Sequence, residues 1–174
     1  DNEDYFKRKA TFNDENGKLF KDNDERAIFF AKGVIETIKR LNWSPDIIHV
    51  HGWLSSFLPL YLKEMYKDEP IFHNSKVVTS IYGTGFDGSL NKKLQDKILF
   101  DEIEKNKIAG IGDPNYVNLM KNAIDFSDAL IIGSENISKD LQDYLNNCKK
   151  PVLEFQSKDS FIEKYTEFYN KILN

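Results

Sequence analysis

The sequence predicts an α/β fold in which a mostly parallel sheet carries helices on both faces. Short runs rich in β-branched residues alternate along the chain with longer stretches of helical periodicity. Such alternation is typical of a parallel sheet, because each helix returns the chain to the end of the sheet where the next strand begins. The 174 residues, of which 40% are hydrophobic and 30% charged, suffice for one compact domain with a core.

The chain opens with a polar segment and a long helix. Residues 1–21 contain turn formers and little periodicity, which predicts a loop or a hairpin. Asp22 and Asn23 suit the N-cap of a helix of about five turns, which the Trp43-Ser44-Pro45 segment ends. The apolar positions of this helix recur at helical spacing: Ile28, Ala31, Ile35, Ile38 and Leu41.

Strands and helices alternate through the rest of the chain. Strands are predicted near 46–50, 76–81, 128–132 and 151–155. Helices are predicted over 54–66, 91–107, 115–126, from 134 or 135 to about 147, and over 158–173. The last helix carries one broad apolar stripe, so we expect it to dock on the sheet and end the domain: Phe161, Ile162, Tyr165, Phe168, Tyr169 and Ile172.

Charge and cysteine content argue against several classes of function. The net charge is −4, from 24 basic and 28 acidic residues, whereas nucleic-acid binding needs clustered Lys and Arg. Cys148 is the one cysteine of the chain, so we expect a reducing, cytoplasmic location. No apolar run reaches the ~18 residues of a membrane span and no signal peptide opens the chain, so we expect no membrane partner.

One edge of the predicted sheet gathers candidate binding residues. In parallel sheets ligands bind beyond the carboxyl ends of the strands, where His51-Gly52-Trp53, the loop 82–88 and the stretch after Ser134 meet. Alternation sends His49 and His51 to the same face of their strand. An imidazole could bond a sugar hydroxyl and the Trp53 indole could stack on a sugar ring. For His49 we favour a satisfied core histidine; for His51 and Trp53 binding and packing remain equally open.

The glycine-rich loop after the second strand has two interpretations. The glycines of Tyr82-Gly83-Thr84-Gly85-Phe86-Asp87-Gly88 could let backbone N–H groups approach a phosphate. No clear helix follows at once, so a plain tight loop is favoured. Three histidines without a cysteine pair predict no metal site. Because no nucleophile lies in a recognisable pattern with a base, we predict no catalytic residue in this chain.

Several segments, taken in order, resemble the starch and glycogen synthase family of glycosyltransferases. The resemblance covers about residues 4–145, and the ordered set is more specific than any one piece. The segments are Tyr5-Phe6-Lys7-Arg8, Asp22-Asn23-Asp24-Glu25-Arg26, Pro45-Asp46-Ile47-Ile48-His49-Val50-His51-Gly52-Trp53, Pro59-Leu60-Tyr61-Leu62, Asn118-Leu119-Met120-Lys121-Asn122-Ala123-Ile124-Asp125-Phe126-Ser127-Asp128, and Ser134. The fold implied is a Rossmann-like parallel sheet similar to the N-terminal domain of a two-domain, GT-B glycosyltransferase.

The chain departs from the family pattern at the rim, the edge of the sheet where the strands end and the candidate binding residues gather. Gly52 stands where the family has Asp in His-Asp-Trp, Tyr82 where it has a His close to the reacting sugar, and Gly83 where it has the following Asn. The family's Lys-Thr-Gly-Gly loop would precede residue 1, and no second nucleotide-binding domain is expected within 1–174. We therefore expect one domain that is incomplete at its N-terminus, with one exposed sheet edge where preceding strands would pair.

The resemblance implies transfer of glucose from ADP-glucose or UDP-glucose to an α-1,4-glucan, with the sugar nucleotide as substrate and no cofactor. We expect this chain not to be active alone, because it lacks the donor-binding half. The implied substrate-binding residues are Phe6, His51, Trp53, Tyr82 and Phe86. One alternative is a non-catalytic glucan-binding or regulatory relative of glycogen synthase. Another is a Rossmann-like domain that binds a different sugar nucleotide.

Overall fold

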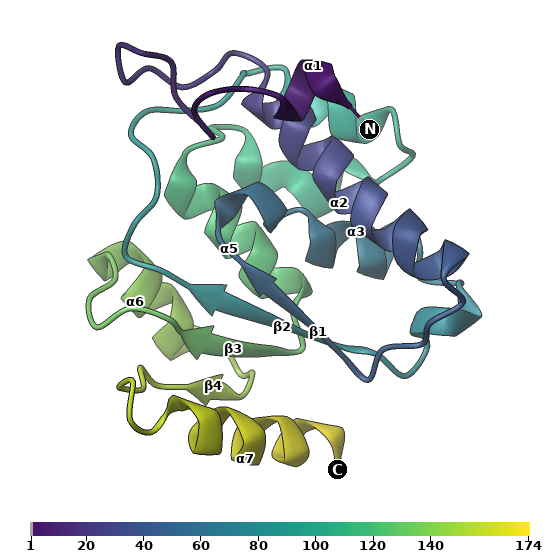
Figure 1. The fold of residues 1–174 in the computed structure, drawn as a ribbon, viewed down its shortest axis with the longest axis vertical. Helices are drawn as coiled ribbons and strands as arrows, with labels where there is room; N and C mark the ends of the chain where they lie inside the picture. The colour runs from purple at the N-terminus through teal and green to yellow at the C-terminus, as the bar shows by residue number, and fades with distance from the viewer. Residues whose placement is uncertain (1) are drawn as a thin grey trace.

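A four-stranded sheet forms the centre of the protein, described here by a computed structural model over residues 2–174. The strand order is β1-β2-β3-β4, and every pair of neighbours is parallel (Figure 1). The strands are β1 Ile47–His51, β2 Lys76–Ile81, β3 Ala129–Ile132 and β4 Val152–Leu153. The predicted parallel sheet is confirmed, and β4 is shorter than the predicted 151–155.

The helices lie close to the predicted positions but two of them are interrupted. The predicted helix 54–66 divides into a 3₁₀ turn, Trp53–Ser55, and α3. The predicted helix 91–107 ends early at α4, because Glu102 adopts a positive φ of 63° that a right-handed helix cannot continue through. The α-helices are α1 Glu3–Phe6, α2 Asn23–Arg40, α3 Leu58–Glu64, α4 Leu94–Leu99, α5 Tyr116–Phe126, α6 Lys139–Asn147 and α7 Phe161–Leu173; further 3₁₀ helices span Pro70–Phe72 and Lys105–Ile111.

The polar segment before α2 folds as a short helix and a hairpin-like turn. The sequence predicts a loop or a hairpin here, whereas Glu3–Phe6 forms α1. Asn13 and Leu19 then make an antiparallel bridge, and Gly17 turns the chain between them with a φ of 77°. Only glycine adopts that conformation without a steric penalty, so the turn depends on residue 17.

The two faces of the sheet are covered unequally. The strand order follows the chain order, so right-handed crossovers place α3, α5 and α6 on one face, where α2 also packs. Alternate strand residues, such as Val50, Val77 and Leu130, point into this larger core. The opposite face receives the segment after β4, which is α7, seen below the sheet in Figure 1. Helices on both faces are therefore confirmed.

The terminal helix docks on this second face, as predicted. Phe168 is 7% exposed and packs with Val78, Ala129 and Ile131 of the sheet. The contact uses only part of the predicted stripe, because Phe161 and Ile162 at the start of the helix remain exposed. Tyr165, Tyr169 and Ile172 complete the docked side.

Strand β1 forms one edge of the sheet. It pairs with β2 on one side, and no strand lies along its outer side within residues 2–174, which agrees with the predicted exposed edge. The backbone groups on that side are free to pair with another strand. None of the helices among the described residues is both long and apolar enough to cross a membrane.

Candidate functional site

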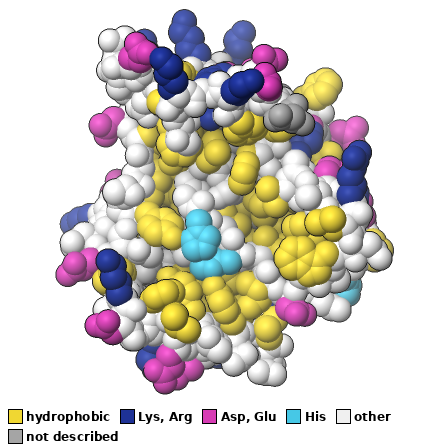
Figure 2. Space-filling view, viewed as in Figure 1, with side chains coloured by type: hydrophobic (Ala, Val, Ile, Leu, Met, Phe, Trp, Pro, Cys, Tyr) yellow, Lys and Arg dark blue, Asp and Glu magenta, His cyan; other side chains and the backbone are white. Residues whose placement is uncertain are grey.

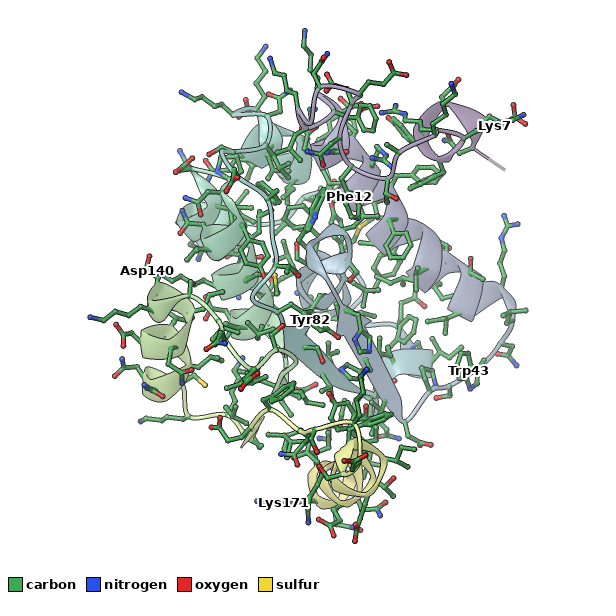
Figure 3. All side chains as sticks on the ribbon, turned by 60° about the vertical axis from the view of Figure 1, so that its left-hand side comes forward. Lys7, Phe12, Trp43, Tyr82, Asp140 and Lys171 are labelled. Atoms are coloured by element: carbon green, nitrogen blue, oxygen red, sulfur yellow. The ribbon has the colours of Figure 1, made fainter. Side chains whose placement is uncertain are left out.

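The candidate site lies where the strands end. The segments that follow β1, β2 and β3 converge at this edge, and Figure 3 shows Tyr82 at the tip of the β2 arrow. The Nδ1 atom of His51 lies 2.7 Å from the Tyr82 hydroxyl oxygen, so the two strand ends share a hydrogen bond. Phe12, from the turn before α2, reaches the same place. The fold thus joins residues 31 positions apart on neighbouring strands.

Three of the five predicted binding residues line one pocket. His51, Trp53 and Tyr82 surround a space of about 250 Å³ together with Phe12 and Thr84. A wider pocket of about 800 Å³ adjoins it between the turn 13–21 and the loop 83–91. The two pockets share Gly85, and Phe86 lines the wider one. We refer to these two neighbouring pockets at the carboxyl edge of the sheet as the groove.

The groove combines aromatic walls with polar side chains. The polar lining of the wider pocket carries amides, a carboxylate, a hydroxyl and ammonium groups: Asn13, Lys18, Lys21, Asp87, Ser89 and Asn91. Hydroxyl-rich ligands present both ring faces and hydrogen-bonding groups, which match such a mixed lining. This chemistry fits a carbohydrate better than a purely apolar molecule.

Trp53 is largely buried inside this site. Its ring lies 4.7 Å from the Phe12 ring and 5.0 Å from the Phe86 ring, measured between centroids, and only 6% of the residue is exposed. Stacking on a sugar needs an open ring face, which these two neighbours restrict. Burial therefore favours packing, one of the two interpretations that the sequence leaves open. Phe86, which is half-buried, also contacts Tyr116.

Phe6 lies apart from the other four predicted residues. It is on α1, where it packs against Phe29 of α2 with 5.9 Å between ring centroids. The guanidinium carbon of Arg26 lies 5.4 Å from the Phe6 ring centroid. Phe6 lines neither pocket of the groove. The aromatic residues that reach the groove from this part of the chain are Phe12 and Phe20, which no motif in the sequence distinguishes.

The glycines of the loop after β2 serve close packing. A Cβ atom at Gly83 would overlap the backbone carbonyl oxygen of Asn136, and one at Gly85 would overlap the Tyr116 ring. The Gly83 N–H donates to the Ser134 hydroxyl, 3.1 Å away, which ties the ends of β2 and β3 together. The geometry agrees with the predicted tight loop. Tyr116 also donates from its hydroxyl to the Tyr82 carbonyl oxygen, a support that the sequence did not indicate.

The two histidines of β1 lie on the same face, as predicted, but in different environments. His49 is half-buried, with Nε2 2.8 Å from the Ser80 hydroxyl and Nδ1 2.6 Å from the Tyr169 hydroxyl. Both of its nitrogens are therefore occupied, which confirms the satisfied core histidine. Burial, with a smaller contribution from His51, lowers the pKa of His49 to about 4. Burial also lowers the pKa of His51.

The rim residue Gly52 has a conformation that suits glycine. Its φ is 74° and its ψ is 164°, a region that other residues enter only with strain. The position offers no carboxylate beside His51, and Nδ1 of that imidazole is hydrogen-bonded with the Tyr82 hydroxyl. No group of three or more His, Cys, Asp or Glu side chains is arranged to hold a metal ion in the described part of the chain.

Comparisons with known proteins place this geometry in context. Residues 1–150 match the family described as the starch synthase catalytic domain. A glycogen synthase of Chlorobium luteolum is 37% identical over 149 residues, which are 84% of this chain and 30% of that protein. A glycogen synthase of Chlorobium limicola is 39% identical over 130 residues, covering 74% of this chain and 26% of the relative. The chain thus spans less than a third of the length of these relatives.

A solved structure supports the fold. The catalytic domain of starch synthase IV from Arabidopsis thaliana, bound to ADP and acarbose, superimposes with a TM-score of 0.65. The similarity covers 88% of this chain and 33% of the plant chain at 18% sequence identity. At that identity the match establishes the α/β fold.

Proposed function

The chain belongs to the starch synthase catalytic domain family, and on this premise we propose that it forms the glucan-side domain of a glucosyltransferase. The reaction would transfer glucose from ADP-glucose or UDP-glucose to an α-1,4-glucan. The sugar nucleotide would be a substrate, with no cofactor required. We further propose a cytoplasmic location, with which the single cysteine is consistent. We propose neither nucleic acid nor membrane as a partner.

The groove at the carboxyl edge of the sheet carries this proposal. Its narrow part presents the His51 and Tyr82 side chains, and its wide part presents amides, Ser89 and Phe86. The ADP and acarbose bound to the plant starch synthase IV domain are a nucleotide and a carbohydrate ligand of a protein with the same fold. We therefore assign the acceptor glucan to this groove.

We propose that this chain does not transfer glucose by itself. Glucosyl transfer builds charge on the leaving diphosphate, which fixed positive groups must stabilise in a site closed to water. Stabilisation of this kind contributes several kcal/mol to catalysis. At the rim of this chain Gly52 supplies no carboxylate and Tyr82 supplies a phenol in place of an imidazole. A second, nucleotide-binding domain would have to supply the missing groups.

A second candidate is a glucan-binding or regulatory relative without catalysis. The observation that favours it is that the local backbone accommodates the two residues that depart from the family pattern, Gly52 and Tyr82. Gly52 adopts a conformation that strains other residues, and a Cβ atom at Gly133 would overlap the Tyr82 ring. The departures from the family pattern are thus part of the packing at the rim, as expected for a pocket with a binding role.

Calorimetry and a transfer assay on the purified chain test these proposals. We expect saturable binding of maltohexaose that weakens when Tyr82→Phe removes the hydroxyl bonded to His51. Tyr144→Phe is the matched control, since its hydroxyl bonds Asp125 and neither residue lines the groove. We expect no transfer from ADP-glucose or UDP-glucose. Measurable transfer would refute the inactive-domain proposal, and failure to bind maltohexaose would refute the glucan site.

A further inference from the structure

The terminal helix contacts the rear of the candidate site through polar side chains. Helix α7 lies outside the family match, which ends at residue 150. Its Tyr169 hydroxyl bonds Nδ1 of His49, 120 positions earlier in the chain. The other nitrogen of that imidazole bonds Ser80 on β2. His49 is therefore held between the helix and the neighbouring strand.

His49 in turn packs against the residue that lines the pocket. The ring centroids of His49 and His51 are 3.9 Å apart, with the planes tilted by 40°. His51 then bonds the Tyr82 hydroxyl at the pocket wall. An unbroken series of contacts thus runs from Tyr169 on α7 through the two imidazoles to Tyr82. Figure 2 shows histidine at the centre of this view, amid hydrophobic side chains and with most charged side chains near the periphery.

We propose that Tyr169 and His49 are positioning residues for the His51–Tyr82 pair, so that α7 sets the geometry of the pocket. The proposal rests on the proposed function in that the pocket takes a glucan. His51 is exposed at the strand end, and its Nε2 has no hydrogen-bond partner within residues 2–174. The packed His49 ring and the Tyr82 bond limit the directions in which that free nitrogen points.

The competing explanation is that α7 only covers the apolar face. Phe168 and Ile172 meet that need through their contacts with Val78, Ala129 and Ile131, and a Tyr hydroxyl adds nothing to such burial. In that case removal of the Tyr169 hydroxyl would leave the pocket unchanged. The two explanations therefore differ in what Tyr169→Phe does to His51, which lies two contacts from the altered atom.

Imidazole ¹⁵N NMR on the folded chain distinguishes the two. Without ligand, we expect Tyr169→Phe to change the ¹⁵N shifts of His49, because one nitrogen loses its partner, and to change those of His51 as well. We expect the dissociation constant for maltohexaose, measured by calorimetry, to rise about three- to tenfold, the size of one lost hydrogen bond. Tyr144→Phe should change neither measurement, since its hydroxyl bonds Asp125.

Each outcome decides between the explanations. The positioning proposal is overturned if the ¹⁵N shifts of His51 in Tyr169→Phe equal those of the wild type. It is also overturned if the wild type binds maltohexaose and the substitution leaves the dissociation constant unchanged. If the wild type does not bind maltohexaose but the His51 shifts still move, the proposed function fails while the positioning role stands. Should Tyr169→Phe destabilise the helix, Ser80→Ala removes the other His49 bond from within the sheet. It should then displace the same His51 signals, and unchanged signals would again refute the proposal.

Discussion

Single residues at the rim control how the loops pack against one another. Gly83 brings the loop after β2 against the backbone of the segment after β3, and Gly85 brings it against the Tyr116 ring. Tyr82 occupies the space that Gly133 leaves open. Because the neighbours in these contacts are backbone atoms or half-buried rings held by hydrogen bonds, they have little room to yield. The shape of the groove therefore depends on glycine at these positions, because a side chain there would overlap a neighbouring group.

The first residue-scale prediction concerns Gly83. In Gly83→Ala the new methyl group would overlap the Asn136 carbonyl, so the two loops must separate. We expect a loss of about 1–3 kcal/mol in the free energy of unfolding, the usual effect of overpacking. Urea denaturation followed by circular dichroism measures it. Gly110→Ala is the control, because nothing lies within 4 Å of a Cβ there. Equal stability of the two variants would contradict the prediction.

The second residue-scale prediction concerns pH. Burial lowers the pKa of His49 from 6.5 to about 4, so between these values the unfolded chain binds more protons than the folded one. Stability is therefore highest above pH 6.5 and falls as the pH drops toward 4. His51, whose pKa is also lowered, acts in the same direction. The titratable groups packed with His49 are His51, Tyr165 and Tyr169.

Urea denaturation at pH 7 and pH 5 measures this effect. We expect the His49 contribution to be of the order of 1–2 kcal/mol, discounted for its partial exposure to solvent. His49→Gln should reduce the difference between the two pH values, whereas His73→Gln, at an exposed position, should leave it unchanged. An unaltered difference in His49→Gln would show that other groups cause the pH dependence.

At the scale of the elements, α7 is the main cover of the second sheet face. The crossovers after β1, β2 and β3 all place their helices on the opposite face, so Val78, Ala129 and Ile131 depend on the segment after β4 for burial. Phe168 is the buried centre of that contact. The helix thus combines an apolar covering role with the polar contact from Tyr169 to His49.

A pair of substitutions on α7 separates its docked side from its free side. Phe168→Ala removes the buried ring, and we expect a loss of about 3–5 kcal/mol in the free energy of unfolding. Ile162→Ala, at a residue that is 71% exposed, should change it by less than about 0.5 kcal/mol. Thermal melting of both variants is the measurement. Deletion of residues 158–174 should likewise lower the melting temperature, and similar melting of all forms would show that the helix does not stabilise the fold.

At the scale of the molecule, we propose that this chain binds the glucan and that glucosyl transfer needs a second, nucleotide-binding domain. The chain contributes one α/β unit with a groove at the carboxyl edge of its sheet, and it spans less than a third of the glycogen synthases it resembles. A transition state with developing charge needs groups on both sides of the reacting sugar. A single rim exposed to solvent can hold a glucan by many weak contacts, which is the role we propose for it.

The sequence by itself determined the four strands, most of the helices and the family. The β-branched runs located all four strands, since alternation and helical periodicity are local patterns that neighbouring residues carry. The apolar stripe of the last helix required a surface to cover, and the helix docks as expected. The rim also followed from sequence, because parallel strands all end on one edge and bring His51 near Tyr82.

Only the tertiary structure decided which side chains meet. It buried Trp53 between Phe12 and Phe86, separated Phe6 from the groove, and broke the helix predicted over 91–107 at Glu102. It also joined Tyr169 to His49. These pairings connect residues up to 120 positions apart, and their geometry depends on the packing of several elements at once. Periodicity shows which face of an element is apolar, but it cannot show which distant side chain fills the space opposite.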